Sequence, residues 1–339
     1  MDLTGTALII LGGIMEGLFS LPVKLTPRWS WENIWGLGSL AALILVPAPL
    51  LLFTVPDFSS VYASSPTWTI ILVGLFGLGW GFGGIFFGLG VTELGLSLGT
   101  SSIMGLIAIG GSIVPLIMRH QGELISRSNV ALVLGIGIMI AGLALCSRAG
   151  KLKFATTGEV ETSGERRSFG RGIFYCIAAG LLSALVNFAL IFGDPIAQAA
   201  KSRGVPDAAS TNAIWAIVFA ANYLVNVVYC VYLMRRRETF GKFSIQATGH
   251  YWLLAVAMGL LWAGGIVIYG LGAVMEGSYG PVFAFPMMLI VSILTANMVG
   301  VFLGEWRGAA KSAKHTMQLG VSVMMIAIVA LGYANWWSQ

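Results

Sequence analysis

Charged residues are scarce in this sequence: only 10% of its 339 residues are Asp, Glu, Lys or Arg, whereas 57% are hydrophobic. A water-soluble protein of this length needs many more charged side chains to cover its surface, so the composition excludes a soluble globular domain. We therefore attribute the formal net charge of +5 to positively charged loops of a membrane protein, which determine its topology. The charge does not indicate a nucleic-acid partner.

Cysteines are few, and sequence motifs of catalysis are absent. Cys146, Cys176 and Cys230 lie in or at the ends of apolar stretches, without CxxC or His spacing, which argues against a disulfide framework and a metal site. The sequence has no phosphate-binding loop, zinc motif or nucleophile elbow, and its Gly-rich runs lie inside apolar stretches. We therefore expect no enzyme activity, no cofactor and no ATP-driven pumping, so an ion or substrate gradient must supply the energy.

Long apolar stretches occupy most of the chain instead. Each is about 18 to 22 residues long, which lets a helix cross a hydrocarbon core of roughly 30 Å, and each is too long and too uniformly apolar for a barrel strand. We therefore predict an all-α membrane protein with ten transmembrane helices. The predicted spans are 6–23, 33–53, 69–90, 98–118, 129–147, 170–192, 210–233, 251–271, 281–303 and 317–336.

Lys and Arg are concentrated in alternate connections between these spans. Fifteen of the 19 lie on one face, and only Arg119, Arg127, Lys201 and Arg203 lie on the other. Because cytoplasmic loops collect positive charge, we predict that the 15 cations are cytoplasmic and that both termini are periplasmic. The longest cytoplasmic connection then divides the chain into two halves.

The two halves resemble each other. Trp80 and Gly88-Leu89-Gly90 match Trp262 and Gly270-Leu271-Gly272 at a shift of 182 residues, and further Trp, Gly and Met matches lie at nearly the same shift. Five spans per half place the halves in opposite orientations, and inverted repeats are typical of secondary transporters. The predicted parts are a first five-helix repeat over 1–150, a cytoplasmic connecting loop over 151–168 and a second five-helix repeat over 169–339.

Glu16 is the one acidic residue near the middle of a predicted span. A carboxylate in a bilayer is costly unless it is protonated, paired or exposed to water, and such residues often mark proton pathways. Glu16 is therefore a candidate for proton coupling and for substrate binding, and Ser20 lies one turn later on the same face. A structural Glu bonded to a neighbouring helix is the alternative. Asp194, near the outer end of the sixth span, is the second candidate for proton coupling.

Amide and aromatic side chains recur on single faces of several spans. Asn187 and Asp194 share one face of the sixth span, and Trp215, Asn222 and Asn226 share one side of the seventh. Aromatic rings stack on the C–H faces of a neutral sugar, and amides pair with its hydroxyls. Interhelical packing is the alternative use of each residue. Together with Glu16 and Ser20, the candidate substrate-binding residues are Trp80, Asn187, Asn226, Trp262 and Tyr269.

Several short strings, spread in order over nearly the whole chain, resemble one family. They are Pro22-x-Lys24, Trp29-Ser30-Trp31-Glu32, Leu94-Gly95-x-Ser97-x-Gly99, Arg148-Ala149-Gly150-Lys151-Leu152-Lys153, Gly259-Leu260-x-Trp262 with Tyr269, and Glu305-Trp306. In this combination the chain resembles the L-rhamnose–proton symporters of the drug/metabolite transporter superfamily. The resemblance implies ten helices in two inverted repeats, a bacterial inner membrane location and uptake of a deoxy sugar with a proton. The family pattern has a small residue in place of Glu16 and a Gln in place of Gly265, so a related sugar such as L-fucose stays an alternative.

The leading hypothesis is therefore a proton-coupled symporter that imports a deoxy sugar by alternating access. Its partners are a monosaccharide, a proton and membrane lipid, without nucleic acid, and it is expected as a monomer or weak homo-oligomer. An exporter or exchanger of amino acids, drugs or other small metabolites of the same superfamily is the alternative. A membrane-embedded enzyme or sensor would need a catalytic constellation or an extramembrane domain, and the sequence has neither.

Overall fold

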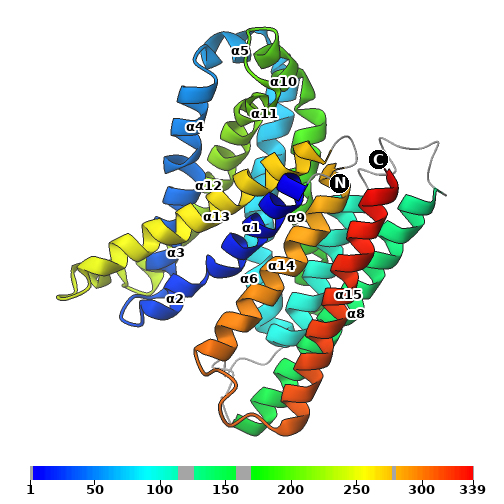
Figure 1. Ribbon diagram of the computed structural model, residues 1–339. Helices are drawn as coiled ribbons and strands as arrows, with labels where there is room; N and C mark the ends of the chain where they lie inside the picture. Colours follow the sequence, from blue (N-terminus) through cyan, green and yellow to red (C-terminus); the bar gives the residue numbers. More distant parts are fainter. Residues whose placement is uncertain (1–2, 114–125, 158–168, 277–279, 339) are drawn as a thin grey trace. The chain divides into compact units, whose positions relative to one another are not determined.

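The computed structural model describes residues 3–113, 126–157, 169–276 and 280–338, and within those ranges it is helical without strands (Figure 1). The helices are α1 (Leu3–Leu18), α2 (Leu21–Leu25), α3 (Trp31–Leu40), α4 (Pro47–Thr54), α5 (Phe58–Ser64), α6 (Thr67–Ala108), α8 (Arg127–Thr157), α9 (Phe169–Phe192), α10 (Asp194–Lys201), α11 (Asp207–Ser210), α12 (Asn212–Arg236), α13 (Gly249–Met275), α14 (Gly280–Phe302) and α15 (Lys311–Ser338). Two π-helical segments, η1 (Ala41–Leu45) and η2 (Ile109–Ile113), and a 3-10 helix, η4 (Phe240–Ser244), complete them.

Nine helical segments of the described residues are long and apolar enough to cross a membrane, and they overlap nine of the ten predicted spans. They are Leu3–Leu25, Trp31–Thr54, Thr67–Val91, Arg127–Lys153, Gly170–Lys201, Asp207–Arg236, Gly249–Met275, Val282–Phe302 and Lys311–Trp337. The tenth, predicted over 98–118, is described only as far as 113, where a shorter apolar helix covers Ser102–Gly111. A multi-span helical membrane protein is thus confirmed, and the tenth span stays a prediction.

The connection between the third and fourth predicted spans is helical. The residues of α6 are in helical conformation from Thr67 to Ala108, including residues 91–97, where the spans 69–90 and 98–118 leave a loop. A Cβ atom added at Gly99 would lie 2.8 Å from the Cα atom of Val91, whereas a straight helix holds residues eight apart about 12 Å from each other. The chain therefore reverses direction between these residues, so α6 consists of two helical segments rather than one long span.

Several spans are interrupted at prolines. α1 ends at Leu18, residues Phe19 and Ser20 form a turn, and α2 begins with Pro22 in its first turn. Pro47 in α4 and Pro195 in α10 also stand in a first turn, where proline has no intrahelical hydrogen bond to lose. The break at Phe19 places non-helical backbone close to Glu16, as is typical of binding sites in transporters.

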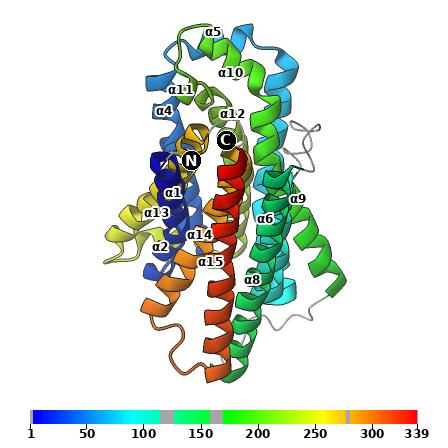
Figure 2. The same cartoon turned by 45° about the vertical axis from the view of Figure 1, so that its right-hand side comes forward.

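The chain forms two compact units, each of which contains segments from both predicted repeats. Unit 1 consists of Met1–Gly13, Gly83–Ala184 and Tyr269–Gln339, and unit 2 of Ile14–Phe82 and Leu185–Ile268. In unit 1, α8 and α15 run side by side along their lengths (Figures 1 and 2). Gly142 and Gly320 allow this approach, because a Cβ atom at either would lie 2.6 Å from a side-chain atom of the other helix.

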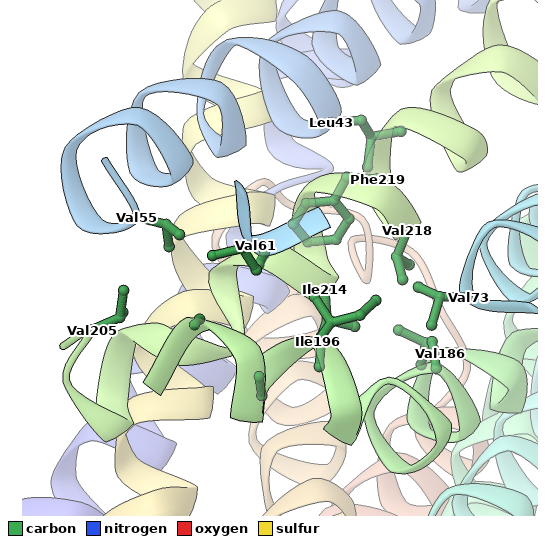
Figure 3. Close-up of a cluster of buried hydrophobic side chains, with 14 of the residues drawn as sticks. Leu43, Val55, Val61, Val73, Val186, Ile196, Val205, Ile214, Val218 and Phe219 are labelled. Atoms are coloured by element: carbon green, nitrogen blue, oxygen red, sulfur yellow. The ribbon is translucent and has the colours of Figure 1, made fainter. Parts of the chain in front are cut away.

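The core of unit 2 is centred on α12. Its buried side chains Ile214, Val218 and Phe219 pack against apolar residues of the segment from η1 to α6 and of α9 and α10 (Figure 3). α6 comes close at Gly77, where a Cβ atom would lie 2.5 Å from the carbonyl oxygen of Val218. Such small-residue contacts let transmembrane helices pack backbone to backbone, and this one brings α6 against α12.

Candidate functional site

Three aromatic rings from different parts of unit 2 meet around a fourth, Trp262. The ring of Trp262 lies 5.9 Å from that of Phe19, 5.9 Å from that of Trp35 and 6.1 Å from that of Trp80, between centroids. Phe19 comes from the turn after α1, Trp35 from α3, Trp80 from α6 and Trp262 from α13. These distances are typical of favourable aromatic pairs, and we call the four rings the aromatic cluster.

The cluster is extended along α12 and α3. The ring of Phe219 lies 5.9 Å from Trp80 and 5.1 Å from Trp215, and Trp31 stacks on Trp35 at 5.1 Å with an interplanar angle of 19°. Trp35, Trp80, Trp215 and Trp262 are half-buried rather than fully buried. Their faces therefore border the packed core of unit 2 without being wholly enclosed by it.

Two buried amides of α12 are bonded to this cluster. The indole Nε1–H of Trp35 donates a hydrogen bond to Oδ1 of Asn226 over 2.8 Å. The amide Nδ2 of Asn226 in turn donates to Oδ1 of Asn222 over 2.6 Å and to the carbonyl oxygen of Asn222 over 3.1 Å. Asn222 is 2% exposed and Asn226 8% exposed. The aromatic cluster therefore has a polar edge built from neutral groups.

Glu16 lies on α1 three residues before Phe19, which stands in the turn that follows this helix. Its carboxyl oxygen Oε1 is buried, and no group of the described residues forms a hydrogen bond with it. A buried carboxyl oxygen without a partner is costly in its charged form. The arrangement therefore suits a group that takes up a proton or that is completed by a bound hydroxyl. Ser20 is exposed in the turn between α1 and α2.

The other predicted residues lie elsewhere. Asn187 is half-buried on α9 in unit 2, and Asp194 is exposed in the first turn of α10, where a carboxylate also favours the helix N-terminus. Tyr269 lies in unit 1, 7% exposed, with its ring 6.1 Å from that of Phe285. Unit 2 therefore brings together Trp80, Trp262 and Asn226, and Asp194 lies at the start of a short surface helix.

Phe19 and Trp35 are absent from the residues predicted from the sequence. Phe19 gave no signal, because an apolar residue near the end of an apolar span is ordinary. Trp35 follows Trp31 by four residues, a spacing that places both on one face. In addition, Ile34-Trp35 matches Ile214-Trp215 of the second half at a shift of 180 residues. Asn222 belongs to the polar stripe of the seventh span, but its bond to Asn226 requires the structure.

A second polar cluster of unit 2 lies where α3 begins and α12 ends. The carboxylate of Glu32 is fully buried, pairs with Nη1 of Arg237 over 3.1 Å and accepts a hydrogen bond from the hydroxyl of Thr239 over 2.8 Å. Asn33 donates to the carbonyl oxygen of Thr239, and Lys242 to the hydroxyl of Ser30. These bonds hold α3 against α12 at one end, and the Trp35–Asn226 bond holds them near the aromatic cluster.

Comparison with known proteins identifies the family of the chain. The L-rhamnose-proton symport protein family matches residues 3–335. Curated relatives named L-rhamnose-proton symporter include those of Shigella dysenteriae serotype 1 (strain Sd197) and Escherichia coli O1:K1 / APEC, each 26% identical over 335 residues and covering 96% of both chains. The relatives are transporters by name and not enzymes. From the extent of the match, the chain belongs to the L-rhamnose-proton symport protein family.

Proposed function

We propose that this protein is a proton-coupled symporter that imports L-rhamnose, or a related 6-deoxy sugar such as L-fucose, through a bacterial inner membrane. The observation that carries the proposal is the family match over residues 3–335, together with relatives named for rhamnose and proton transport. The nine apolar helices of the described residues support a multi-pass membrane location. No cofactor is required, because the proton gradient supplies the energy.

The aromatic cluster supports an uncharged sugar as the substrate. Phe19, Trp35, Trp80 and Trp262 offer apolar faces to the C–H groups and the methyl group of a 6-deoxy sugar. Asn222 and Asn226 border these faces with neutral hydrogen-bonding groups. An exporter of cationic drugs or amino acids needs more acidic groups than this site contains, and the names of the relatives do not favour that alternative.

Glu16 is the proposed proton carrier. Its buried Oε1 atom lacks a hydrogen bond, so the carboxyl is stable when protonated in the closed site and ionises when the site opens to water. One proton that moves inward down a membrane potential of 100 mV releases roughly 2.3 kcal/mol, which supports about fiftyfold accumulation of a neutral sugar. Tight coupling therefore requires that protonation of Glu16 and sugar binding accompany each other.

Alternating access between two inverted five-helix repeats is the proposed transport mechanism. The composition of unit 2 supports it: a shift of 182 residues carries 14–82 onto 196–264, which lies within the second segment of the same unit, Leu185–Ile268. Each repeat thus contributes the corresponding piece of chain to one compact body. Repeats that exchange equivalent positions are the usual basis of alternating access.

Transport by purified protein in liposomes tests the proposal. With a proton gradient, we expect labelled L-rhamnose to accumulate and the external medium to become alkaline as sugar and protons enter together. Glu16→Gln imitates the protonated carboxyl, so it should retain exchange of internal for external sugar while accumulation falls by about the fiftyfold that one proton supports. Asp194→Asn is the matched control and should accumulate sugar normally.

Two results would overturn parts of this proposal. If the wild type neither binds nor moves L-rhamnose or L-fucose, the assignment of the substrate is wrong. If Glu16→Gln still accumulates sugar with protons while Asp194→Asn does not, the proton carrier is Asp194 instead.

A further inference from the structure

The three-residue chain Trp35–Asn226–Asn222 has a fixed direction. An indole N–H can only donate, so the atom of Asn226 that faces Trp35 must be the carbonyl oxygen. The NH2 group of Asn226 then faces Asn222, where it donates to the side-chain oxygen and to the backbone carbonyl oxygen. The atom of Asn222 that receives this bond must therefore be its own amide oxygen. One donor-only group thus sets the orientation of both amides.

These bonds use the whole donor capacity of the Asn226 side chain. Its amide nitrogen donates to two oxygens of Asn222, and its oxygen receives the indole N–H. If the Asn226 amide flipped, its NH2 group would face the indole N–H of Trp35, and neither group would have an acceptor. Because Asn226 is only 8% exposed, water could not replace the lost bonds. Asn226 is therefore better suited to hold Trp35 than to exchange partners with a passing sugar.

The indole of Trp35 is restrained on its other sides as well. Trp31 stacks on it, and Trp262 and Phe19 lie against it at 5.9 and 6.3 Å between ring centroids. Stacking alone lets a ring slide or rotate in its own plane, whereas a hydrogen bond at Nε1 defines that rotation. The bond to Asn226 thus determines which edge of Trp35 borders Trp262.

We propose that Asn222 is a positioning residue of the sugar site, which acts through Asn226 to fix the plane and rotation of Trp35. The inference rests on the proposed function, because it assumes that the sugar packs on the aromatic cluster. Asn222 itself needs no contact with the sugar. Its loss frees the Asn226 amide to turn, and Trp35 then presents a variable surface to the substrate.

The test combines transport with a direct probe of the Trp35 bond. Protein labelled with 15N-tryptophan gives an indole N–H signal for Trp35, identified by its absence in Trp35→Phe, and its exchange with water reports the hydrogen bond. Asn222→Ala should speed this exchange at least tenfold. It should also raise the KM for L-rhamnose about tenfold, with the maximal rate within about twofold of wild type.

Two further variants separate positioning from general stability. Asn222→Asp keeps an oxygen that accepts from Asn226, so it should recover at least half of the lost exchange protection and affinity. Asn212→Ala is the matched control: Asn212 is also on α12, and its amide also donates to a side chain of another helix, Thr54, over 2.9 Å. It should leave both the Trp35 signal and the KM unchanged.

The possible outcomes are distinct. An Asn222→Ala protein with wild-type indole exchange, or with faster exchange and a wild-type KM, overturns the inference. Equal effects of Asn222→Ala and Asn212→Ala overturn it too. If Asn222→Ala does not fold, Trp35→Phe decides: it removes the indole donor together with part of the ring, so a wild-type KM refutes the role of the bond. A wild type without sugar transport refutes the proposed function, and the indole exchange still tests the bond.

Discussion

Gly77 is where a single methyl group should separate two closely packed helices of unit 2, α6 and α12. In Gly77→Ala the new Cβ atom would lie 2.5 Å from the carbonyl oxygen of Val218 and 2.9 Å from the Cβ atom of Ala221. Both neighbours belong to α12, and a backbone oxygen cannot rotate away as a flexible side chain can. Ordinary contact begins near 3.4 Å, so α6 and α12 must move apart by about 1 Å, a typical response to overpacking.

The magnitude follows from two terms. Overpacking of this kind lowers the free energy of unfolding by about 1–3 kcal/mol, whereas the replacement of Gly by Ala inside a helix raises it by up to about 1 kcal/mol. Gly84 is the matched control on the same helix, because a Cβ atom there meets nothing within 4 Å. The two variants share the helix term, so the difference between them should equal the overpacking term of about 1–3 kcal/mol.

The assay is unfolding of the purified protein in mixed detergent micelles, with the KM for L-rhamnose measured in liposomes. We expect Gly77→Ala to be less stable than Gly84→Ala by the stated margin. It should also have a raised KM, because α12 holds Asn222 and Asn226. Equal stabilities within about 0.5 kcal/mol, the usual scale for a surface substitution, would mean that α6 and α12 are not packed backbone to backbone at Gly77.

Two other predictions concern the ends of the helices. Arg237→Ala leaves the buried Glu32 carboxylate with its hydrogen bond from Thr239 but without its ion pair, so we expect the protein to lose about 2 kcal/mol of stability. Adding Glu32→Gln should restore part of this loss. The control is Arg236→Ala, whose exposed side chain donates a hydrogen bond to Tyr232 in the described structure, and it should be neutral in the same unfolding assay. The distribution of Lys and Arg predicts that a reporter fused after Gln339 is periplasmic and one inserted within 151–168 is cytoplasmic. The opposite reporter pattern would reverse the predicted topology.

The sequence predicted the helical spans better than the connections between them. Apolar runs report burial in lipid directly, so nine spans coincide with described helices. The helical turn through Glu93 and Gly99 could not be predicted, because a charged residue between apolar runs normally indicates a polar loop. In the structure Glu93 pairs with Arg171 over 3.0 Å, and this partner lies far away in the sequence.

The candidate site was predicted only in outline. Trp80 and Trp262 stood out because the repeat places them at equivalent positions, and the structure brings their rings to 6.1 Å. Asn226 was expected to face the substrate, whereas its amide is engaged by Trp35 and Asn222. Hydrogen bonds between helices depend on their rotation about their own axes. Periodicity within one helix gives the face but not the partner.

The composition of the two units has a consequence for how the protein is made. The segment Ile14–Phe82 is completed by Leu185–Ile268, so about 100 residues are synthesised in between, which takes roughly 5 to 20 s at bacterial rates of elongation. During this interval Gly77, Trp80 and Trp35 are in the membrane without α12, and their packing surfaces must be covered by lipid or by an insertion factor. Neither unit has all of its segments in a nascent chain that stops at residue 150. Folding of both units therefore depends on the second half of the chain, and a truncation before Ile268 should yield two incomplete units rather than one intact unit.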